Sequence, residues 1–222
     1  MCGRVTITRP QKILEKFAVD FQDCSLPKPR YNVCPSQMLP IVIESKGKRH
    51  LVEAKWGVIP RWAKDKKGYP SLINARVETV HTKSIFRPAL EHRRCLVPVD
   101  GFYEWKHSGR SKQAFYIFLK DRDLFGLAGL YEEPIGEDTP RSFCILTTVA
   151  NEFMQSIHDR MPVILPAECD HSWLDASSKD ISALHDFLTS LPDETLDGHA
   201  VSPYVNSPLN EGEQCIQDSC RG

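Results

Sequence analysis

The fold is decided by residues 95–106, which read CLVPVDGFYEWK. β-Branched and aromatic residues on both sides of Asp100-Gly101 predict two strands, and Asp-Gly is a strong signal for a two-residue hairpin turn. Further apolar runs predict strands at 39–44, 51–56, 113–119, 124–131 and 142–149. We therefore expect the two halves of 95–106 to pair with each other within a largely antiparallel sheet or barrel.

Helical patterns flank this strand-rich middle. Residues 10–21 begin with a proline, and their apolar side chains recur at helical spacing, at Leu14, Phe17, Ala18 and Phe21. Further helices are expected at 84–93, 150–157, 167–175 and 179–189. Strands in the middle and helices at both ends predict an α+β fold. We expect one domain over residues 1–222, with a core at about 2–206 and a loose polar tail at 207–222.

The composition is that of an ordinary globular protein, 41% hydrophobic and 26% charged. No apolar run reaches the roughly 20 residues of a membrane span, and the N-terminus has no apolar stretch typical of a secretory signal. The eight cysteines include no CxxC pair, and the histidines are scattered. We therefore expect a cytoplasmic protein with free thiols, no metal site and no cofactor.

The net charge of −1 hides an asymmetry along the chain. Residues 46–112 contain 16 Lys and Arg against 6 Asp and Glu, whereas residues 165–222 contain 2 against 11. Two solvated faces of opposite charge would explain this pattern. Composition alone favours this explanation, and the alternative is a basic groove for a polyanion, backed by an acidic surface.

Cys2 has a chemistry that internal cysteines lack. Removal of Met1 is normally efficient when a small residue follows, and it would make Cys2 the N-terminus. An N-terminal cysteine holds an amine with a pKa of about 8 and a thiol with a pKa of about 8.5 on adjacent carbons. This pair condenses with an aldehyde to an imine and then closes a five-membered thiazolidine. The alternative is a frayed end at which the residue in position 2 is arbitrary.

Several long blocks occur in order along the chain. They are MCGR (1–4), RYNVCPSQ (30–37), WGVIPRW (56–62), INARVET (73–79), FRPAL (86–90), RRCLVPVDGFYEW (93–105), IHDRMPVIL (157–165) and VSPYVN (201–206). Through these blocks the chain resembles the SOS response-associated peptidase (SRAP) family, the abasic-site processing proteins of bacteria and eukaryotes. The resemblance implies a monomer that crosslinks Cys2 to the ring-opened aldehyde of an abasic site in single-stranded DNA. It also implies association with the nucleoid when the protein is bound to DNA.

The resemblance implies four catalytic residues: Cys2, Asn74, Glu104 and His158. The Asn74 amide would hold the Cys2 amine and the sugar oxygen in register, and a Glu104 carboxyl among aromatic neighbours would transfer protons. His158 would move protons during sugar opening, imine formation and reversal. The alternatives are a helix N-cap for Asn74, an exposed strand position for Glu104, and a helix end held by a backbone carbonyl for His158.

The resemblance also implies a DNA-binding surface. Arg4, Arg76, Arg87 and Arg160 match cations that would bind phosphates, because guanidinium groups suit phosphate oxygens. Trp56 and Trp62 flank a loop from which a tryptophan could stack on a base beside the lesion. The alternative for these residues is core packing, which we favour for Trp56.

Three other functions compete with this interpretation. A chain beginning MCG is also compatible with an N-terminal-nucleophile glutamine amidotransferase, in which Asn74 and Arg76 would serve the oxyanion and the substrate. A non-covalent reader of single-stranded DNA would use the basic segment and not need Cys2. The family name implies a peptidase, and removal of its own Met1 would satisfy that name. A lyase acting on abasic DNA is a related possibility.

Overall fold

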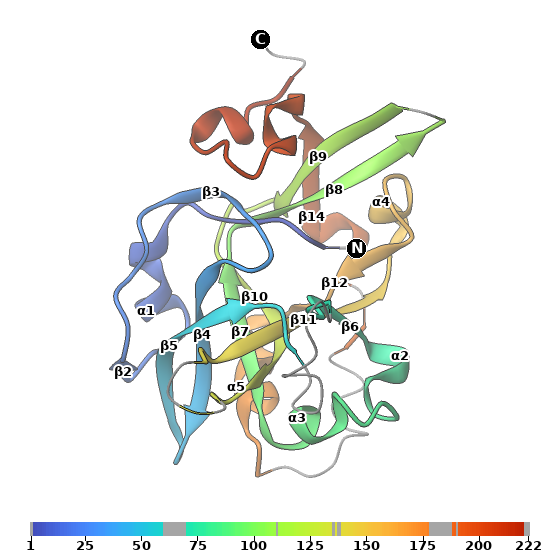
Figure 1. Cartoon of the computed structure of the whole chain (residues 1–222). Coiled ribbons are helices and arrows are strands. Elements are labelled where there is room, and N and C mark those ends of the chain that lie inside the picture. The colour runs from blue at the N-terminus through green and yellow to red at the C-terminus, as the bar shows by residue number, and fades with distance from the viewer. Residues whose placement is uncertain are drawn as a thin grey trace.

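A computed structural model describes residues 2–59, 70–109, 111–134, 136, 139–177, 188–189 and 191–219. Trp62 and nearly all of the helix expected at 179–189 lie outside these ranges. The strands form two sheets with short helices around them, which confirms the predicted α+β fold with antiparallel sheets (Figure 1). No helix in the described ranges is long and apolar enough to cross a bilayer.

The larger sheet closes into a barrel. Its ring follows the order β11, β10, β7, β4 and β5, and a parallel pairing of β5 with β11 joins the two ends. Trp56 at the end of β5 lies opposite Phe143 in this closing pair. The ring strands are β4 (Met38–Ser45), β5 (Lys48–Trp56), β7 (Arg94–Val99), β10 (Phe125–Glu132) and β11 (Ser142–Val149). Shorter strands extend it: β2 (Phe21–Gln22), β6 (Asn74–Arg76), β12 (Arg160–Pro162) and β13 (Ile164–Leu165).

The second sheet is antiparallel and contains the first strand of the chain. Its order is β14 (Leu196–Ala200), β9 (Ser111–Leu119), β8 (Gly101–Ser108), β1 (Val5–Ile7) and β3 (Arg30–Val33). The strands β8 and β9 form a long ribbon that extends beyond the rest of the sheet (Figure 1).

The predicted hairpin at Asp100-Gly101 is wrong. The strand before it, β7, pairs with β4 and β10, while β8 pairs with β1 and β9. Gly101 does not have the positive φ that a type I′ turn requires. The glycine serves a close approach instead, because a Cβ at this position would lie 2.3 Å from Cε2 of Tyr116. Asp100-Gly101 is therefore the point at which the chain passes from the barrel to the second sheet.

The Asp100 carboxylate fixes the first strand at this crossing. One oxygen accepts the Thr6 hydroxyl at 2.6 Å, and the other accepts the backbone N–H and the hydroxyl of Thr8 at 2.6 and 2.7 Å. The backbone N–H of Arg9 donates to the same oxygen at 3.2 Å. Asp100 is only 3% exposed. This network sets the position of β1 on β8 and with it the position of the N-terminus.

The helices are shorter than predicted. The pattern at 10–21 forms a 3₁₀ turn (Pro10–Lys12) and α1 (Ile13–Lys16), after which Ala18 takes a positive φ. The N–H of Val19 then donates to the Leu14 carbonyl, which ends the helix in a Schellman motif. Phe21 lies in a strand and stacks on His50. The other α-helices in the described ranges are α2 (Val77–Val80), α3 (Arg87–His92), α4 (Glu152–Gln155) and α5 (Asp170–Leu174).

The tail predicted to be loose is packed over its described part, residues 207–219. The Glu211 carboxylate accepts the Arg30 guanidinium and the backbone N–H of Tyr31. The Asn32 amide donates to the Asn210 carbonyl, and Cys215 is fully buried. The prediction was wrong because polar groups of the tail accept hydrogen bonds from donors of β3 instead of from water.

Replacing Asp100 should therefore destabilise the whole fold. We expect Asp100→Ala to lower the free energy of unfolding by about 2 to 4 kcal/mol, because each buried donor left without an acceptor costs about 1 to 3 kcal/mol. Asp100→Asn keeps one side-chain oxygen as a hydrogen-bond acceptor and should lower the free energy of unfolding by less. Asp121→Ala, at an exposed aspartate, is the control and should cost less than about 1 kcal/mol. Urea denaturation measures all three, and an Asp100→Ala protein as stable as the control would contradict the role of this carboxylate.

Candidate functional site

The N-terminus lies inside the molecule, at the meeting point of both sheets. β1 runs antiparallel to β8 with Val5 opposite Phe102, and the Tyr103 N–H donates to the Arg4 carbonyl at 2.9 Å. The residues before Val5 therefore continue along β8 towards Glu104. Cys2 is 0% exposed, and Figure 1 shows the N-terminus in the middle of the molecule rather than projecting from an edge.

Asn74 contacts Cys2 directly. Its amide nitrogen donates to the Cys2 carbonyl at 2.8 Å. Asn74 begins β6, which pairs in parallel with β11, so it is a strand residue and not the N-cap considered from the sequence. Its side-chain oxygen is buried and accepts no hydrogen bond from the described residues. A buried amide oxygen beside Cys2 is therefore available to a donor such as an amine or a sugar hydroxyl.

Glu104 lies within electrostatic reach of Cys2. It is 3% exposed, so the exposed-strand alternative is wrong. Burial, and secondarily the Glu104 carboxylate, raise the pKa of the Cys2 thiol to about 12 in the chain that retains Met1. The thiol pKa of about 8.5 given above is that of a free N-terminal cysteine and applies to Cys2 after removal of Met1. Chemistry at this sulfur needs a base, and Glu104 is a carboxylate near it.

His158 lies two residues before β12, which pairs with β11 as β6 does. β11 pairs with β6 on one edge and with β12 on the other, so that Thr147 lies between Arg76 and Pro162. The backbone N–H of Arg160 donates to His158 Nδ1 at 2.9 Å, which leaves the proton of the neutral ring on Nε2. The Asp159 carboxylate lies 2.8 Å from the same nitrogen and would pair with a protonated ring. Both protonation states therefore have a partner, as a proton-transfer group requires.

Arg160 is held by the protein itself. Its guanidinium forms two hydrogen bonds to the Glu78 carboxylate and donates to the Thr147 carbonyl at 2.6 Å. The residue is 9% exposed, and this contact lowers the pKa of Glu78. In this arrangement Arg160 ties α2 to β12 and braces the segment that contains His158.

Arg4 also makes internal contacts. Its guanidinium donates to Asn32 Oδ1 at 2.6 Å and to the Val205 carbonyl at 2.7 Å, and it lies 5.5 Å from the ring centre of Trp105. These contacts join the start of the chain to β3, to β8 and to the VSPYVN block. They hold the N-terminus in place and leave little of the guanidinium for a phosphate.

Two of the four predicted arginines are open to a ligand. Arg76 is exposed at the end of β6, two residues after Asn74. The Arg87 side chain is 64% exposed at the start of α3, where it pairs with Glu91 one helical turn later. An exposed helical pair of this kind contributes little to stability and exchanges readily for a phosphate.

Trp56 packs in the core. It is 0% exposed, stacks at 6.2 Å on Phe143 and donates its indole N–H to the Ile73 carbonyl at 3.0 Å. A side chain with no exposed surface cannot stack on a base. The structure therefore favours the core-packing alternative for Trp56 over the base-stacking role.

Sequence reasoning missed two residues that support the site. Asp100 fixes β1, but in the sequence its position directly before Gly101 was a stronger, and misleading, signal for a turn. Glu78 holds Arg160, and only the block INARVET marked it. A carboxylate and its partner 82 positions away leave no local signature in the sequence.

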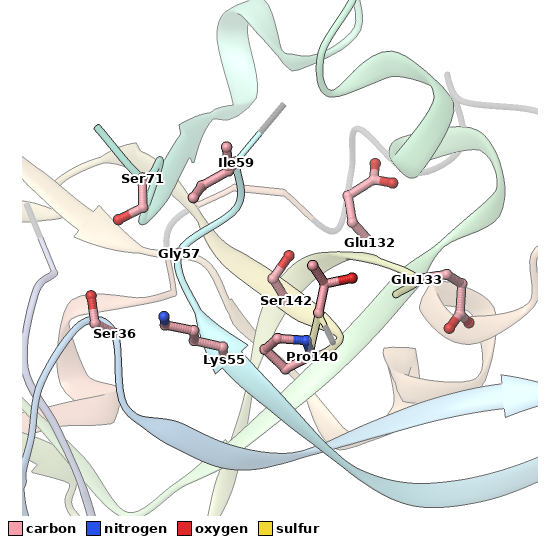
Figure 2. Close-up of a pocket in the computed structure, with 10 residues that line it drawn as sticks. Ser36, Lys55, Gly57, Ile59, Ser71, Glu132, Glu133, Pro140 and Ser142 are labelled. Carbon is pink, nitrogen blue, oxygen red and sulfur yellow. The ribbon is translucent and has the colours of Figure 1, made fainter. Parts of the chain in front are cut away.

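A separate pocket of about 360 Å³ opens where β5 and β11 meet. Figure 2 shows Ser36 and Lys55 on one side of it and Glu132 and Glu133 on the other. The described residues that line it include none of Cys2, Asn74, Glu104 and His158, so the pocket is separate from the residues indicated by the sequence. Nor do the described residues contain a group of acidic, histidine or cysteine side chains that could hold a metal. The cluster around Cys2 is therefore the candidate active site.

The comparison with known proteins identifies the family. The profile described as SOS response associated peptidase (SRAP) matches residues 1–208. The chain belongs to the SRAP family. This membership confirms the resemblance seen in the sequence blocks.

Relatives in the SRAP family have names that refer to one activity. "Abasic site processing protein YoqW" of Bacillus subtilis (strain 168) is 40% identical over 222 residues, covering 98% of this chain and 99% of the relative. "Abasic site processing protein YedK" of Escherichia coli (strain K12) is 32% identical, with 98% and 99% covered. A crystal structure of a Bacteroides thetaiotaomicron protein superposes with a TM-score of 0.86 at 26% identity, covering 98% of this chain and 100% of the other.

The influence of Glu104 on Cys2 is measurable by alkylation. In the chain that retains Met1, Cys2 should react very slowly with iodoacetamide at neutral pH. Glu104→Gln removes a charge that raises the Cys2 pKa, so the inflection of the rate against pH should move to lower pH. Peptide mapping by mass spectrometry separates Cys2 from the other cysteines.

The matched control is Glu53→Gln. The Glu53 carboxylate raises the pKa of Cys24, so this variant should shift the profile of Cys24 and leave that of Cys2 unchanged. A Cys2 profile that is the same in wild type and Glu104→Gln would show that Glu104 does not act on the thiol.

Proposed function

We propose that this protein traps abasic sites in single-stranded DNA, and that the trap is Cys2 after removal of Met1. The observation that carries the proposal is the placement of Cys2, fully buried, bonded through its carbonyl to Asn74 and within electrostatic reach of Glu104. A frayed terminus would have none of these contacts. The names of the SRAP relatives supply the substrate class.

The reaction begins at the amine. The α-amine of Cys2 attacks the C1′ aldehyde of the ring-opened sugar, and the resulting carbinolamine loses water to give an imine. The thiol sulfur then bonds to the imine carbon, and its proton passes to the nitrogen as the C=N π electrons move there. The product is a thiazolidine, and the only molecule released is water.

The residues around Cys2 divide this work between them. Glu104 lies within electrostatic reach of the thiol, so it accepts the thiol proton as the sulfur adds and returns it to the nitrogen. The free oxygen of Asn74 holds the amine or the opened sugar in position. His158, with its proton on Nε2, donates to the ring oxygen as the hemiacetal opens.

The need for a single strand follows from the burial of Cys2. A sugar within a stacked duplex does not reach an interior residue unless its nucleotide turns out of the helix. Turning a nucleotide out costs a few kcal/mol of unpairing and unstacking free energy, and this cost is smaller in a strand that is already unpaired. Of the predicted phosphate contacts, we retain Arg76 and Arg87, whose side chains are exposed. Arg160 and Arg4 act by bracing the site.

The rival functions have weaker support. In a glutamine amidotransferase the Asn74 amide N–H would stabilise an oxyanion, but here it donates to the Cys2 carbonyl. Peptidase activity is proposed only for the bond between Met1 and Cys2, and lyase activity only as a later reaction of the imine.

The test of the proposed function is incubation of the purified protein with a single strand containing one abasic site. We expect a band that survives denaturation, none with an undamaged strand, and no glutaminase activity.

Variants should separate chemistry from binding. Glu104→Gln should slow formation of the denaturation-resistant adduct at saturating DNA while leaving binding of an undamaged strand near normal. His158→Ala should slow sugar opening or reversal by about 10² if acid–base catalysis is its main role. Arg87→Ala should instead weaken binding and leave the rate at saturation unchanged. Single-turnover rates from denaturing gels measure these effects, and identical behaviour of Glu104→Gln and Arg87→Ala would refute the assignment.

A further inference from the structure

The ribbon of β8 and β9 continues outward from the site as a basic arm. We define the β8–β9 arm as residues 105–109 and 111–113; all of them are exposed except the half-buried Trp105. The sequence from 105 to 120 has no aspartate or glutamate and contains Lys106, Arg110, Lys112 and Lys120. In Figure 1 the ribbon extends past the N-terminus and beyond the rest of its sheet.

The strand register divides the arm into two faces. Paired residues on neighbouring strands point to the same side, and the side alternates along each strand. The pairs Glu104–Phe115, Lys106–Gln113 and Ser108–Ser111 therefore share one face. The pairs Trp105–Ala114 and His107–Lys112 lie on the other face. Lys106 is thus on the face of Glu104, the residue next to Cys2, about 7 Å further along the strand.

The opposite face is already occupied. The Lys112 ammonium lies 4.9 Å from the ring centre of Trp105, and the Trp105 indole N–H donates to Asn206 at 2.8 Å. Tyr103 and Ala114 on this face pack with the C-terminal residues Val201, Val205 and Cys215. Among the described side chains, by contrast, none forms an ion pair or hydrogen bond with Lys106. The site-facing side of the arm therefore presents an exposed cation, Lys106, that has no ion-pair partner among the described side chains.

We propose that the Lys106 face of the β8–β9 arm binds the phosphate backbone of the strand whose abasic sugar reacts with Cys2. This inference rests on the proposed function and extends it to a contact on the side of the site formed by β8. A lysine one pleat beyond Glu104 meets a phosphate close to the reacting sugar, and a phosphate contact fixes the register of the strand without reading its sequence.

The test is the salt dependence of binding to an undamaged, fluorescein-labelled oligothymidylate. If wild type neutralises about 3 to 5 phosphates, log K should fall against log salt with a slope of roughly −2 to −3.5. Lys106→Gln should bind several-fold more weakly and reduce the magnitude of the slope by about 0.7, the share of one phosphate on a single strand. Lys106→Arg should restore both values.

The matched control is Lys112→Gln, which removes the same charge from the other face of the same arm. It should leave the slope at the wild-type value, and thermal melting should show that all three variants are folded. A Lys106→Gln protein that matches wild type, or one that matches Lys112→Gln, would overturn the proposal. Failure of the proposed function would appear separately, as wild-type protein that binds strands but forms no adduct with abasic DNA.

Discussion

The structure depends on the carboxylate of Asp100. It accepts hydrogen bonds from Thr6, Thr8 and Arg9 at the point where the chain leaves the barrel for the second sheet. Because these donors belong to the first strand and its continuation, the contact locks the N-terminal segment onto β8. Cys2, four residues before Thr6, is thereby held within electrostatic reach of Glu104, and its carbonyl accepts a hydrogen bond from the Asn74 amide. A terminus that would otherwise fray thereby becomes a buried part of the candidate site.

Burial of the nucleophile has a chemical consequence. A buried thiol with a pKa of about 12 is inert towards most electrophiles at neutral pH, which protects it from oxidation and alkylation. In the proposed reaction, the amine therefore attacks first and a carboxylate takes the thiol proton. The proposed thiazolidine requires a carbonyl carbon such as that of an aldehyde, because the amine and the thiol must both bond to one carbon.

The sequence predicted the strands of the barrel well, because their apolar runs are long and bounded by turns. Their pairing could not be predicted: Asp100-Gly101 has the local signature of a hairpin, while the Thr6 and Tyr116 contacts that determine its conformation lie 94 and 16 positions away. The family blocks indicated Cys2, Asn74 and Glu104, which the structure brings together. The blocks could not show that Arg4 and Arg160 are held by internal acceptors, since guanidinium groups suit carboxylates and carbonyls as well as phosphates.

The central claim is that the free amine of Cys2 is required together with its thiol. The most direct measurement is adduct yield on abasic single-stranded DNA as a function of the fraction of protein that has lost Met1, determined by intact-protein mass spectrometry. We predict that yield follows the processed fraction and is zero for a chain with Met1 retained or with a fused N-terminal tag. Cys2→Ala with Met1 removed should give only an imine that borohydride traps. A tagged chain that crosslinks abasic DNA at full yield would contradict the account.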